Sequence, residues 1–327
     1  MQWWLTAEIL KNIMTNQQDL MISLNGDCLD YIFKMLPIGD RINMIISYQN
    51  FYDIFRKRLR IEYKTNLNTK FFNTLQTFQL QVLLSIIGSY IKHLKIEFPF
   101  EEQSYLREFI YFKFLFTYCI NVESLKYFGW SVNDESMKYL KSLRNLKSLA
   151  IINNSEITEN INCLAQLPQL KQLELWRDNI ISPPITKEFL CNLAQYQAKQ
   201  LDSLKLVDCS SFDEEKASLV AQLENLKVLH CICNPCDEAI METFSNLSKL
   251  EELYINNSYF ITNRSVLQLL SKCPRVKRLN LKSCGLITAD LIANLLYLLK
   301  RQRLLHSDRV QIDLNPYKFS DKISVDI

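Results

Sequence analysis

The chain contains little glycine and little proline, with five and eight residues of each type among 327. This scarcity leaves little room for long low-complexity linkers, which are rich in such residues. The hydrophobic content of 48% and the charged content of 22% are typical of a globular protein with a substantial core. The net charge of +3 favours neither a nucleic acid nor an acidic membrane as a partner.

Long apolar runs are also missing. No segment offers about 20 uninterrupted apolar residues, so we expect no transmembrane helix. The first residues, MQWWLTAEILKNIM, lack a basic start, and Glu8 and Lys11 interrupt their apolar part, so we expect no signal peptide. These observations predict a cytoplasmic or nuclear protein whose ten cysteines are reduced thiols.

Catalytic motifs are absent as well. The sequence has no glycine-rich dinucleotide or phosphate-binding motif, and its three histidines lie in no hydrolase motif. The stretch HCICNPC, residues 230–236, has a C-x-x-C spacing typical of zinc sites, but alternation along a strand sends His230 and Cys231 to opposite faces. Because a zinc site needs four convergent ligands, we predict no metal, no cofactor and no enzymatic activity.

What the sequence does contain is a repeated spacing of apolar residues. Val276, Leu279 and Leu281 follow one another at gaps of three and two, so the last two can share one face of a strand. The spacing occurs eight times, and the copies begin at Ile91, Val122, Leu146, Leu170, Leu201, Leu226, Leu250 and Val276. Steps of 24 to 31 residues indicate a solenoid, in which each unit has a strand, a turn and a helix and buries its apolar face by stacking.

The residue that follows each strand supports the same repeat. The ninth positions of the third to eighth units are small, polar or thiol residues, namely Asn154, Asp178, Cys209, Asn234, Ser258 and Cys284. Such side chains can hydrogen-bond the backbone at the turn that leaves the strand. The pattern resembles the leucine-rich repeat, L-x-x-L-x-L-x-x-(N/C), and residues 261–288 resemble its cysteine-containing subclass. The resemblance implies an α/β solenoid, a curved parallel sheet lined by helices, with a closing strand near Val310 and Ile312.

Residues 24 to 55 follow a helical spacing instead. One apolar stripe, at i, i+3, i+4 and i+7, is formed by Leu29, Ile32, Phe33 and Leu36. Pro37 should end this helix, Asp40 is expected to cap a second one, and a third is expected from Gln49. Three short helices enclose little core, so either other parts of the chain or a partner must cover some of their apolar residues.

This stripe, together with Asp40, resembles an F-box, with Asn25 in place of the usual proline and Phe51 in place of a later tryptophan. The resemblance implies a docking site for a Skp-family adaptor at Leu24, Leu29, Ile32, Phe33, Leu36 and Ile38. The expected organisation is an N-terminal extension at 1–22, the F-box-like module at 23–62, a helical connector at 63–90, the repeat array at 91–317 and a tail at 318–327.

An F-box followed by leucine-rich repeats implies the substrate-recognition subunit of a Skp/cullin/F-box ubiquitin ligase. The adaptor would link the chain to a cullin, and the repeats would hold a protein substrate near the ubiquitin-loaded enzyme, so that proximity does the work. Two alternatives are a repeat scaffold with no ubiquitin role and an enzyme. The scaffold hypothesis predicts that the stripe is buried within the chain, and the ligase hypothesis predicts that it faces solvent.

The substrate face is predicted from residues that alternate with the buried leucines and point to the concave side. The seventh positions of units two to six form an apolar row of about 20 Å, made of Phe128, Ile152, Trp176, Val207 and Ile232. The fifth positions are polar or amphipathic at Glu174, Lys205, His230 and Tyr254. Strand propensity explains part of the row, but an exposed apolar stripe with a polar rim is typical of a recognition surface, with Trp176 as its best anchor.

Overall fold

The structure is a computed structural model that describes residues 25–47, 52–97, 105–128, 131–132, 134–154, 156–157, 159–177, 185–207, 212–231, 236–256, 258–302, 310–313 and 323–325. The chain divides into two compact units. The helical unit comprises Met1–Lys64 and Phe71–Tyr90, and the repeat unit comprises Thr65–Lys70 and Ile91–Ile327.

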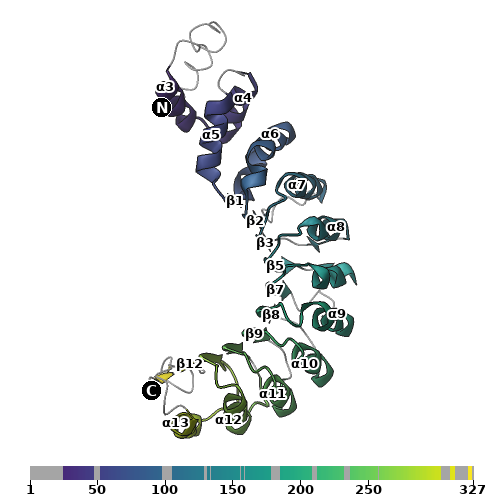
Figure 1. The fold of residues 1–327 in the computed structure, drawn as a ribbon, viewed down its shortest axis with the longest axis vertical. Coiled ribbons are helices and arrows are strands. Elements are labelled where there is room, and N and C mark those ends of the chain that lie inside the picture. The colour runs from purple at the N-terminus through teal and green to yellow at the C-terminus, as the bar shows by residue number, and fades with distance from the viewer. Residues whose placement is uncertain are drawn as a thin grey trace. The chain divides into compact units, whose positions relative to one another are not determined.

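The helical unit contains α3 (Gly26–Met35), α4 (Ile38–Ser47), α5 (Tyr52–Tyr63), α6 (Thr77–Ile87) and the 3₁₀ turn η3 (Gly88–Tyr90), while η2 (Thr69–Thr74) begins in the repeat unit and ends here. Helix α5 packs against α3, α4 and α6, and α4 also packs against α6 (Figure 1). The side chains that fill this core are Leu29, Phe33, Ile42, Met44, Ile45, Phe55, Leu59, Leu80, Leu83 and Leu84. The apolar stripes of these short helices thus cover one another.

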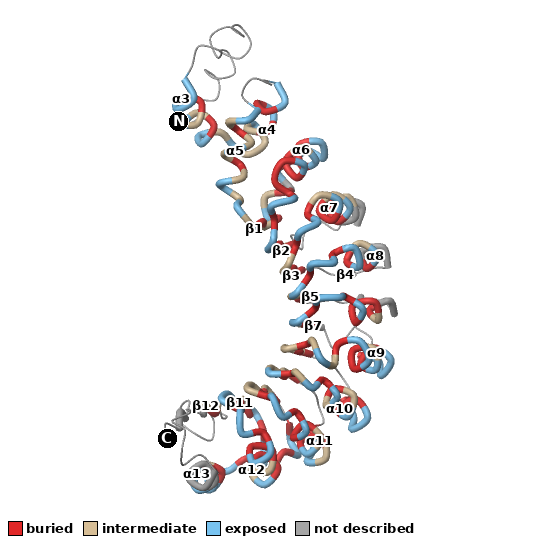
Figure 2. The backbone as a smooth tube through the Cα atoms, in the orientation of Figure 1, coloured by how far each residue is buried: buried red, intermediate tan, exposed pale blue. Residues whose placement is uncertain are grey.

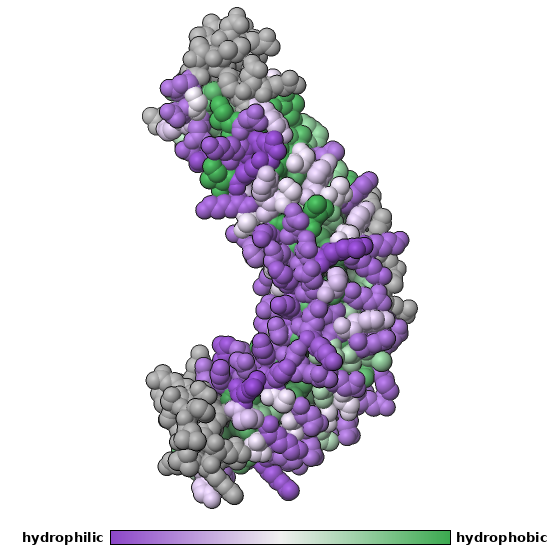
Figure 3. Space-filling model, in the orientation of Figure 1, coloured by the Kyte–Doolittle hydropathy of each residue, from purple (hydrophilic) through white to green (hydrophobic). Residues whose placement is uncertain are grey.

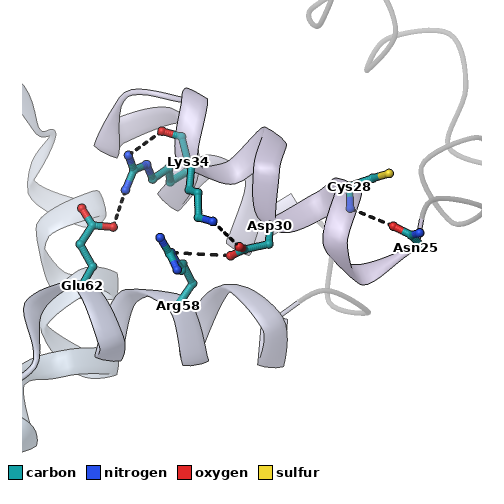
Figure 4. Close-up of polar contacts among 7 residues, drawn as sticks. Asn25, Cys28, Asp30, Lys34, Arg58 and Glu62 are labelled. Atoms are coloured by element: carbon teal, nitrogen blue, oxygen red, sulfur yellow. Dashed lines mark hydrogen bonds and ion pairs between the residues drawn. The ribbon is translucent and has the colours of Figure 1, made fainter.

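Helix α3 begins one residue after Asn25, whose side-chain Oδ1 accepts a hydrogen bond from the Cys28 amide at 2.8 Å (Figure 4). A residue with this geometry satisfies an amide that the helix leaves unpaired. Helix α4 begins at Ile38, which puts its capping position at Pro37, so the prediction of Asp40 as its cap was wrong by three residues. Asp40 lies in the first turn, where its negative charge favours the helix N-terminus.

The repeat unit is built on a sheet whose described strands are β1 (Asn66–Asn68), β2 (His93–Glu97), β3 (Ser124–Phe128), β5 (Ser148–Asn154), β7 (Gln172–Arg177), β8 (Ser203–Val207), β9 (Val228–Cys231), β10 (Glu252–Tyr254), β11 (Arg278–Asn280), β12 (Val310–Asp313) and β13 (Ile323–Val325). Each strand pairs with the next in parallel, except that β12 and β13 are antiparallel. Two short strands, β4 (Ser131–Val132) and β6 (Glu156–Ile157), form a separate parallel pair.

One helical segment follows most strands. These segments are α7 (Tyr105–Tyr118), α8 (Asp134–Ser142), η4 (Glu159–Gln166), α9 (Lys187–Gln197), α10 (Glu214–Val220), α11 (Glu238–Phe244), α12 (Asn263–Lys272) and α13 (Asp290–Gln302). They lie on one side of the sheet, and the buried residues lie between the two layers (Figures 1 and 2). The predicted α/β solenoid, with a parallel sheet lined by helices, is therefore confirmed by this alternation of parallel strands and helices.

The leucines occupy the predicted core positions. Leu204, Leu229, Leu253 and Leu279 are consecutive partners across four strands, and each is at most 1% exposed. Four helices begin with a capping side chain, at Thr186, Asp213, Asp237 and Thr262. Local capping and stacked leucines thus favour the same repeat boundaries.

Buried polar side chains link several repeats to the preceding repeat by hydrogen bonds. Ser258 Oγ donates to the Cys236 carbonyl, and Cys284 Sγ contacts the Ile255 carbonyl at 3.4 Å. Both residues are ninth positions, so the predicted turn role is confirmed for these two, while Asp178, Cys209 and Asn234 lie outside the described residues. At the ends of helices, Gln197 Nε2 donates to two backbone carbonyls of the preceding repeat at 2.6 and 2.9 Å.

The second position of each unit carries a charge, and the signs largely alternate from strand to strand. Glu123 lies between two lysines, with its carboxylate oxygens 3.0 Å from Lys92 Nζ and 2.6 Å from Lys147 Nζ. These hydrogen bonds lower the pKa of Glu123 to about 2. Two similar pairs, each 3.6 Å apart, join Lys227 to Asp202 and Lys277 to Glu251.

Two predicted segment assignments need correction. The connector at 63–90 is not helical throughout, because Asn66–Asn68 forms β1 and pairs with β2. The tail at 318–327 contains β13, which adds an antiparallel strand beyond the predicted closing strand β12. Both strands lie outside the eight copies of the leucine spacing, which also identified strands as short as β10 and β11.

Candidate functional site

The open face of the sheet is the side opposite the helices (Figure 1). Since strand side chains alternate, the residues between the buried leucines must point to this side. Hydrophilic side chains dominate it in Figure 3. It is the candidate interaction surface of the repeat unit because no described helix covers it.

The predicted apolar row along this face is wrong in part. Ile152 and Val207 are only 7% and 4% exposed, whereas Trp176 is 37% exposed and Phe128 is half-buried. Ile232 lies outside the described residues. Trp176 lies on β7, between the strands of Ile152 and Val207, and is the direct partner of Val207. The physical reason is that an indole side chain is wide compared with the spacing of about 4.8 Å between strands, so it can shield smaller neighbours.

A polar hollow of about 240 Å³ lies on the open face, and its lining includes Glu174, the hydrogen-bond partner of Trp176. Small side chains, Ser148, Ala150 and Ser203, make room for it. The other residues that line it are Leu149, Gln172, Leu173, Glu174, Lys205, Val228 and Glu252. Of the predicted fifth-position residues, the hollow therefore brings together Glu174 and Lys205.

Glu174 organises the wall of the hollow. Its carboxylate accepts a hydrogen bond from Trp176 Nε1 at 2.6 Å, and its second oxygen lies 3.5 Å from Lys205 Nζ. The hydrogen bond fixes the indole ring across the face, and the lysine offsets the charge. The Trp176 side chain is thus a positioned, partly exposed anchor.

His230 and Tyr254 continue the face beyond the hollow. Their ring centroids are 5.1 Å apart, and the Tyr254 hydroxyl donates to Glu252 at 3.3 Å. Burial lowers the pKa of His230, and the positive charge of Lys205 adds to this effect, whereas Glu174 opposes it. Burial raises the pKa of Tyr254, as does the Glu252 carboxylate. A neutral imidazole and a neutral phenol thus present an aromatic, weakly polar surface.

A cluster on β2 and β3 was missed in the sequence, although Lys95 and Lys126 both occupy the fifth position of their units. Lys95 Nζ lies 5.0 Å from the centroid of the Phe128 ring, and Lys126 Nζ lies 5.1 Å from it. Glu97 forms ion pairs with Lys95 and with Lys70, the latter at 3.3 Å. We call Lys70, Lys95, Glu97, Lys126 and Phe128 the lysine cluster.

The predicted adaptor stripe in the helical unit does not face solvent as a whole. Leu29 is 1% exposed and Phe33 is 0% exposed, so the prediction of a solvent-facing stripe is wrong for these two. The Phe33 ring stacks on Phe55 of α5 at a centroid distance of 4.4 Å. Ile32, Leu36 and Ile38 are half-buried, and Leu24 lies outside the described residues. The reason is that α5 covers the stripe from within the chain.

Helix α3 exposes other apolar side chains. Tyr31 is 64% exposed and Met35 is 51% exposed, four residues apart on the same helix face. A neighbouring side of the helix is held by ion pairs of Asp30 with Lys34 at 2.8 Å and with Arg58 at 3.6 Å (Figure 4). Figure 3 shows hydrophobic side chains at the surface of this unit.

Three further features of the described residues concern metal ligands, membrane-spanning helices and cysteines. Among the described residues, no group of three or more histidine, cysteine or acidic side chains could hold a metal ion. In the same part of the chain, no helix is long and apolar enough to cross a membrane. Of the cysteines that the structure describes, seven are free thiols and Cys231 is disulfide-bonded, so the prediction of reduced thiols throughout is wrong at Cys231.

Comparisons with known proteins identify similar structures only. No protein-family model and no curated protein matches the sequence. Similar solved structures include an internalin (inlF) from Listeria monocytogenes, with 20% sequence identity and a TM-score of 0.43. The match covers 65% of this chain and only 54% of the internalin chain. Another is internalin C2 (inlC2) from the same species, with 18% identity and a TM-score of 0.37 over 68% of this chain and 80% of the other. The assignment of the repeat architecture therefore depends on the chain's own strands, helices and leucine spacing.

Proposed function

We propose that the protein is a non-catalytic interaction scaffold whose open sheet face binds a protein partner. The observation that carries this proposal is the hollow of about 240 Å³, whose wall residue Glu174 also holds the exposed Trp176 side chain, on a face that no described helix covers. Small-molecule and cofactor sites occupy about 300 to 1,000 Å³, so the hollow suits one inserted side chain of a larger partner.

The chemistry of the face also fits binding better than catalysis. Glu174 and Lys205 lie close enough to offset each other's charge, and the lowered pKa of His230 has burial as its main cause. Aromatic side chains with polar neighbours are typical anchors of protein interfaces. We therefore place the partner's contacts at Trp176, Tyr254 and the hollow between their strands.

Filling the hollow tests this proposal. Ser203→Tyr places a bulky side chain in the hollow, and Ser218→Tyr is the matched control, since Ser218 is exposed on α10 of the same repeat. We expect cross-linking and capture from cells to recover a defined set of partners with the unaltered chain and the control, but not with Ser203→Tyr. The same partners with both folded variants would refute binding at the hollow.

A second candidate is the finer function that the F-box resemblance implies, substrate recognition in a Skp/cullin/F-box ubiquitin ligase in the cytoplasm or nucleus. The observation that favours it is the exposed pair Tyr31 and Met35 on α3, the first described helix of a separate compact unit. We propose that the adaptor would contact this pair and the half-buried Ile32, Leu36 and Ile38, instead of the buried Leu29 and Phe33. The repeats would then hold the substrate, and proximity would promote ubiquitin transfer.

Binding to a purified Skp-family adaptor tests the ligase hypothesis separately. A double variant, Tyr31→Ala with Met35→Ala, should abolish adaptor binding while the chain stays folded. Tyr196→Ala is the control, because Tyr196 is also an exposed aromatic residue, on α9 of the repeat unit. If the unaltered chain shows no adaptor binding, the ligase hypothesis fails and the scaffold proposal is unaffected.

A further inference from the structure

A group of three lysines lies at one end of the open face. The lysine cluster has three ammonium groups, on Lys70, Lys95 and Lys126, and one carboxylate, on Glu97. Within β5 to β11 the charged residues of the face are paired, Lys205 with Glu174 and Arg278 with Glu252. Lys282, just after β11, is a single exposed lysine, so the larger group of positive charges lies over β2 and β3 and the segment after β1.

Two lysines of the cluster are held side by side. Lys95 and Lys126 are direct partners on neighbouring parallel strands. Like charges in this arrangement repel each other, and an arrangement of this kind is stabilised when an anion is near. The Phe128 ring lies within about 5 Å of both ammonium groups, which positions them over one aromatic surface.

The Glu97 carboxylate pairs with only two of the three lysines in the cluster. Although partial burial opposes the effect, hydrogen bonds from Lys95 and Lys70 hold the pKa of Glu97 below its usual value, so it is fully charged near neutral pH. Lys126 is exposed, and within the described part of the chain it has no carboxylate partner. One ammonium group is therefore left to meet an anion from outside.

We propose that the lysine cluster binds an acidic segment of the protein partner, with a carboxylate of that segment placed between Lys95 and Lys126. The inference deepens the proposed function, since it specifies the charge of the partner at the β2–β3 end of the same face. A short acidic peptide fits better than a nucleic acid. Three lysines that share their surface with Glu97 offer few phosphate contacts, whereas polyanion binding generally depends on many.

A peptide-binding measurement tests the proposal. The probe is a fluorescein-labelled eight-residue peptide of alternating glutamate and leucine, titrated with the full chain by fluorescence anisotropy at low salt. An exposed ion pair contributes up to about fivefold in affinity, and reversing a charge adds a repulsion of similar size. We therefore expect Lys126→Glu to weaken binding by about tenfold and higher salt to weaken binding to the unaltered chain.

The matched control is Lys113→Glu, because Lys113 is an exposed lysine on α7, away from the strands. It should bind the peptide as the unaltered chain does. Equal loss in both variants, no loss in Lys126→Glu, or equal binding of a peptide with lysine in place of glutamate would overturn the proposal. Tighter binding of a single-stranded oligonucleotide than of the acidic peptide would also overturn it and indicate a nucleic-acid site.

The outcome is distinguishable from failure of the proposed function. If Ser203→Tyr blocks partner capture but the acidic peptide does not bind, the face binds a partner and only the charge inference is wrong. If the acidic peptide binds through Lys126 but Ser203→Tyr captures the same partners as the unaltered chain, the lysine cluster is a site in its own right and the hollow is not used.

Discussion

Replacing Phe33 by alanine distinguishes a core residue from a docking residue. The side chain is 0% exposed, stacks on Phe55 with an interplanar angle of 12°, and lies 5.3 Å from the guanidinium carbon of Arg41. Arg41 in turn donates to the Leu36 carbonyl at 2.7 Å and pairs with Glu62 at the same distance. The ring is therefore at the centre of the contacts among α3, α4 and α5.

The expected loss of stability is large for a small unit. Deleting a buried phenylalanine side chain costs about 3 to 5 kcal/mol, and the stacked pair with Phe55 is worth about 0.5 to 1.5 kcal/mol beyond buried area. Because the site is fully enclosed, we expect Phe33→Ala to lower the free energy of unfolding of the helical unit by about 4 kcal/mol. Whole domains are stable by only about 5 to 15 kcal/mol, so much of the unit would open.

Hydrogen exchange measured by mass spectrometry reports the stability of each of the two units separately. Exchange should accelerate across α3 to α6 in Phe33→Ala, while β7 to β11 stay protected. Tyr31→Ala is the control on the same helix, and its effect should stay within about 0.5 kcal/mol because Tyr31 is exposed. If Phe33→Ala left exchange in the helical unit unchanged but removed adaptor binding, the argument that Phe33 is a core residue would be refuted.

Three further predictions concern the repeat unit. Leu253→Ala should cost about 2 to 5 kcal/mol and loosen mainly the adjacent repeats in hydrogen exchange, because Leu253 is 0% exposed; even loosening of both units would contradict this. Gln197→Leu should cost about 1 to 3 kcal/mol in chemical unfolding, because two buried carbonyls lose their donor, whereas exposed Gln195→Leu should be nearly neutral. Two lysines depress the pKa of Glu123 from 4.5 to about 2, so its contribution is present above about pH 4.5 and is lost as pH falls through about 2. Glu123→Gln should therefore lower the thermal midpoint at pH 7 but not at pH 2, and an equal difference at both would contradict the pairing.

The leucine spacing predicted the residues of the repeat core well, because eight copies of one pattern are more reliable than the pattern of a single strand. Leu229 and Leu253 occupy the same position in neighbouring units, and both are 0% exposed. A strand of three residues such as Asn66–Asn68 offers no such repetition, since a single leucine carries no period. The sheet was therefore predicted from β2 to β12, and its two end strands were not.

Burial of the site residues depended on neighbours that spacing does not reveal. The alternation placed Ile152, Trp176 and Val207 on one face, but whether the indole shields the two smaller side chains depends on its conformation. In the same way, the sequence of the α3 stripe does not reveal whether a partner or the chain itself covers its apolar side chains. Phe55, 22 positions after Phe33, decides this, and nothing in the helical spacing of α3 specifies that contact.

The lysine cluster could have been found from the sequence. Aligning the units places Lys95 and Lys126 at the same fifth position, which means adjacent lysines once the strands pair in register. The seventh position, Phe128, was examined only as part of an apolar row. A column-by-column comparison of charge across the repeats would have revealed the pair, because parallel strands in a solenoid convert equal positions into neighbours.

The alternating charges at the second position also mean that the repeats are not interchangeable. Glu123 lies between Lys92 and Lys147, so deleting its repeat would bring these two lysines together on adjacent strands. Duplicating a lysine-bearing repeat would likewise create a like-charged pair. Chains that lost the Glu123 repeat by recombination would keep their leucine core but acquire a second like-charged pair beside the one that Lys147 and Lys171 already form. The order of the units thus decides which charges become neighbours, and hybrids of this protein should exchange repeats in neighbouring pairs.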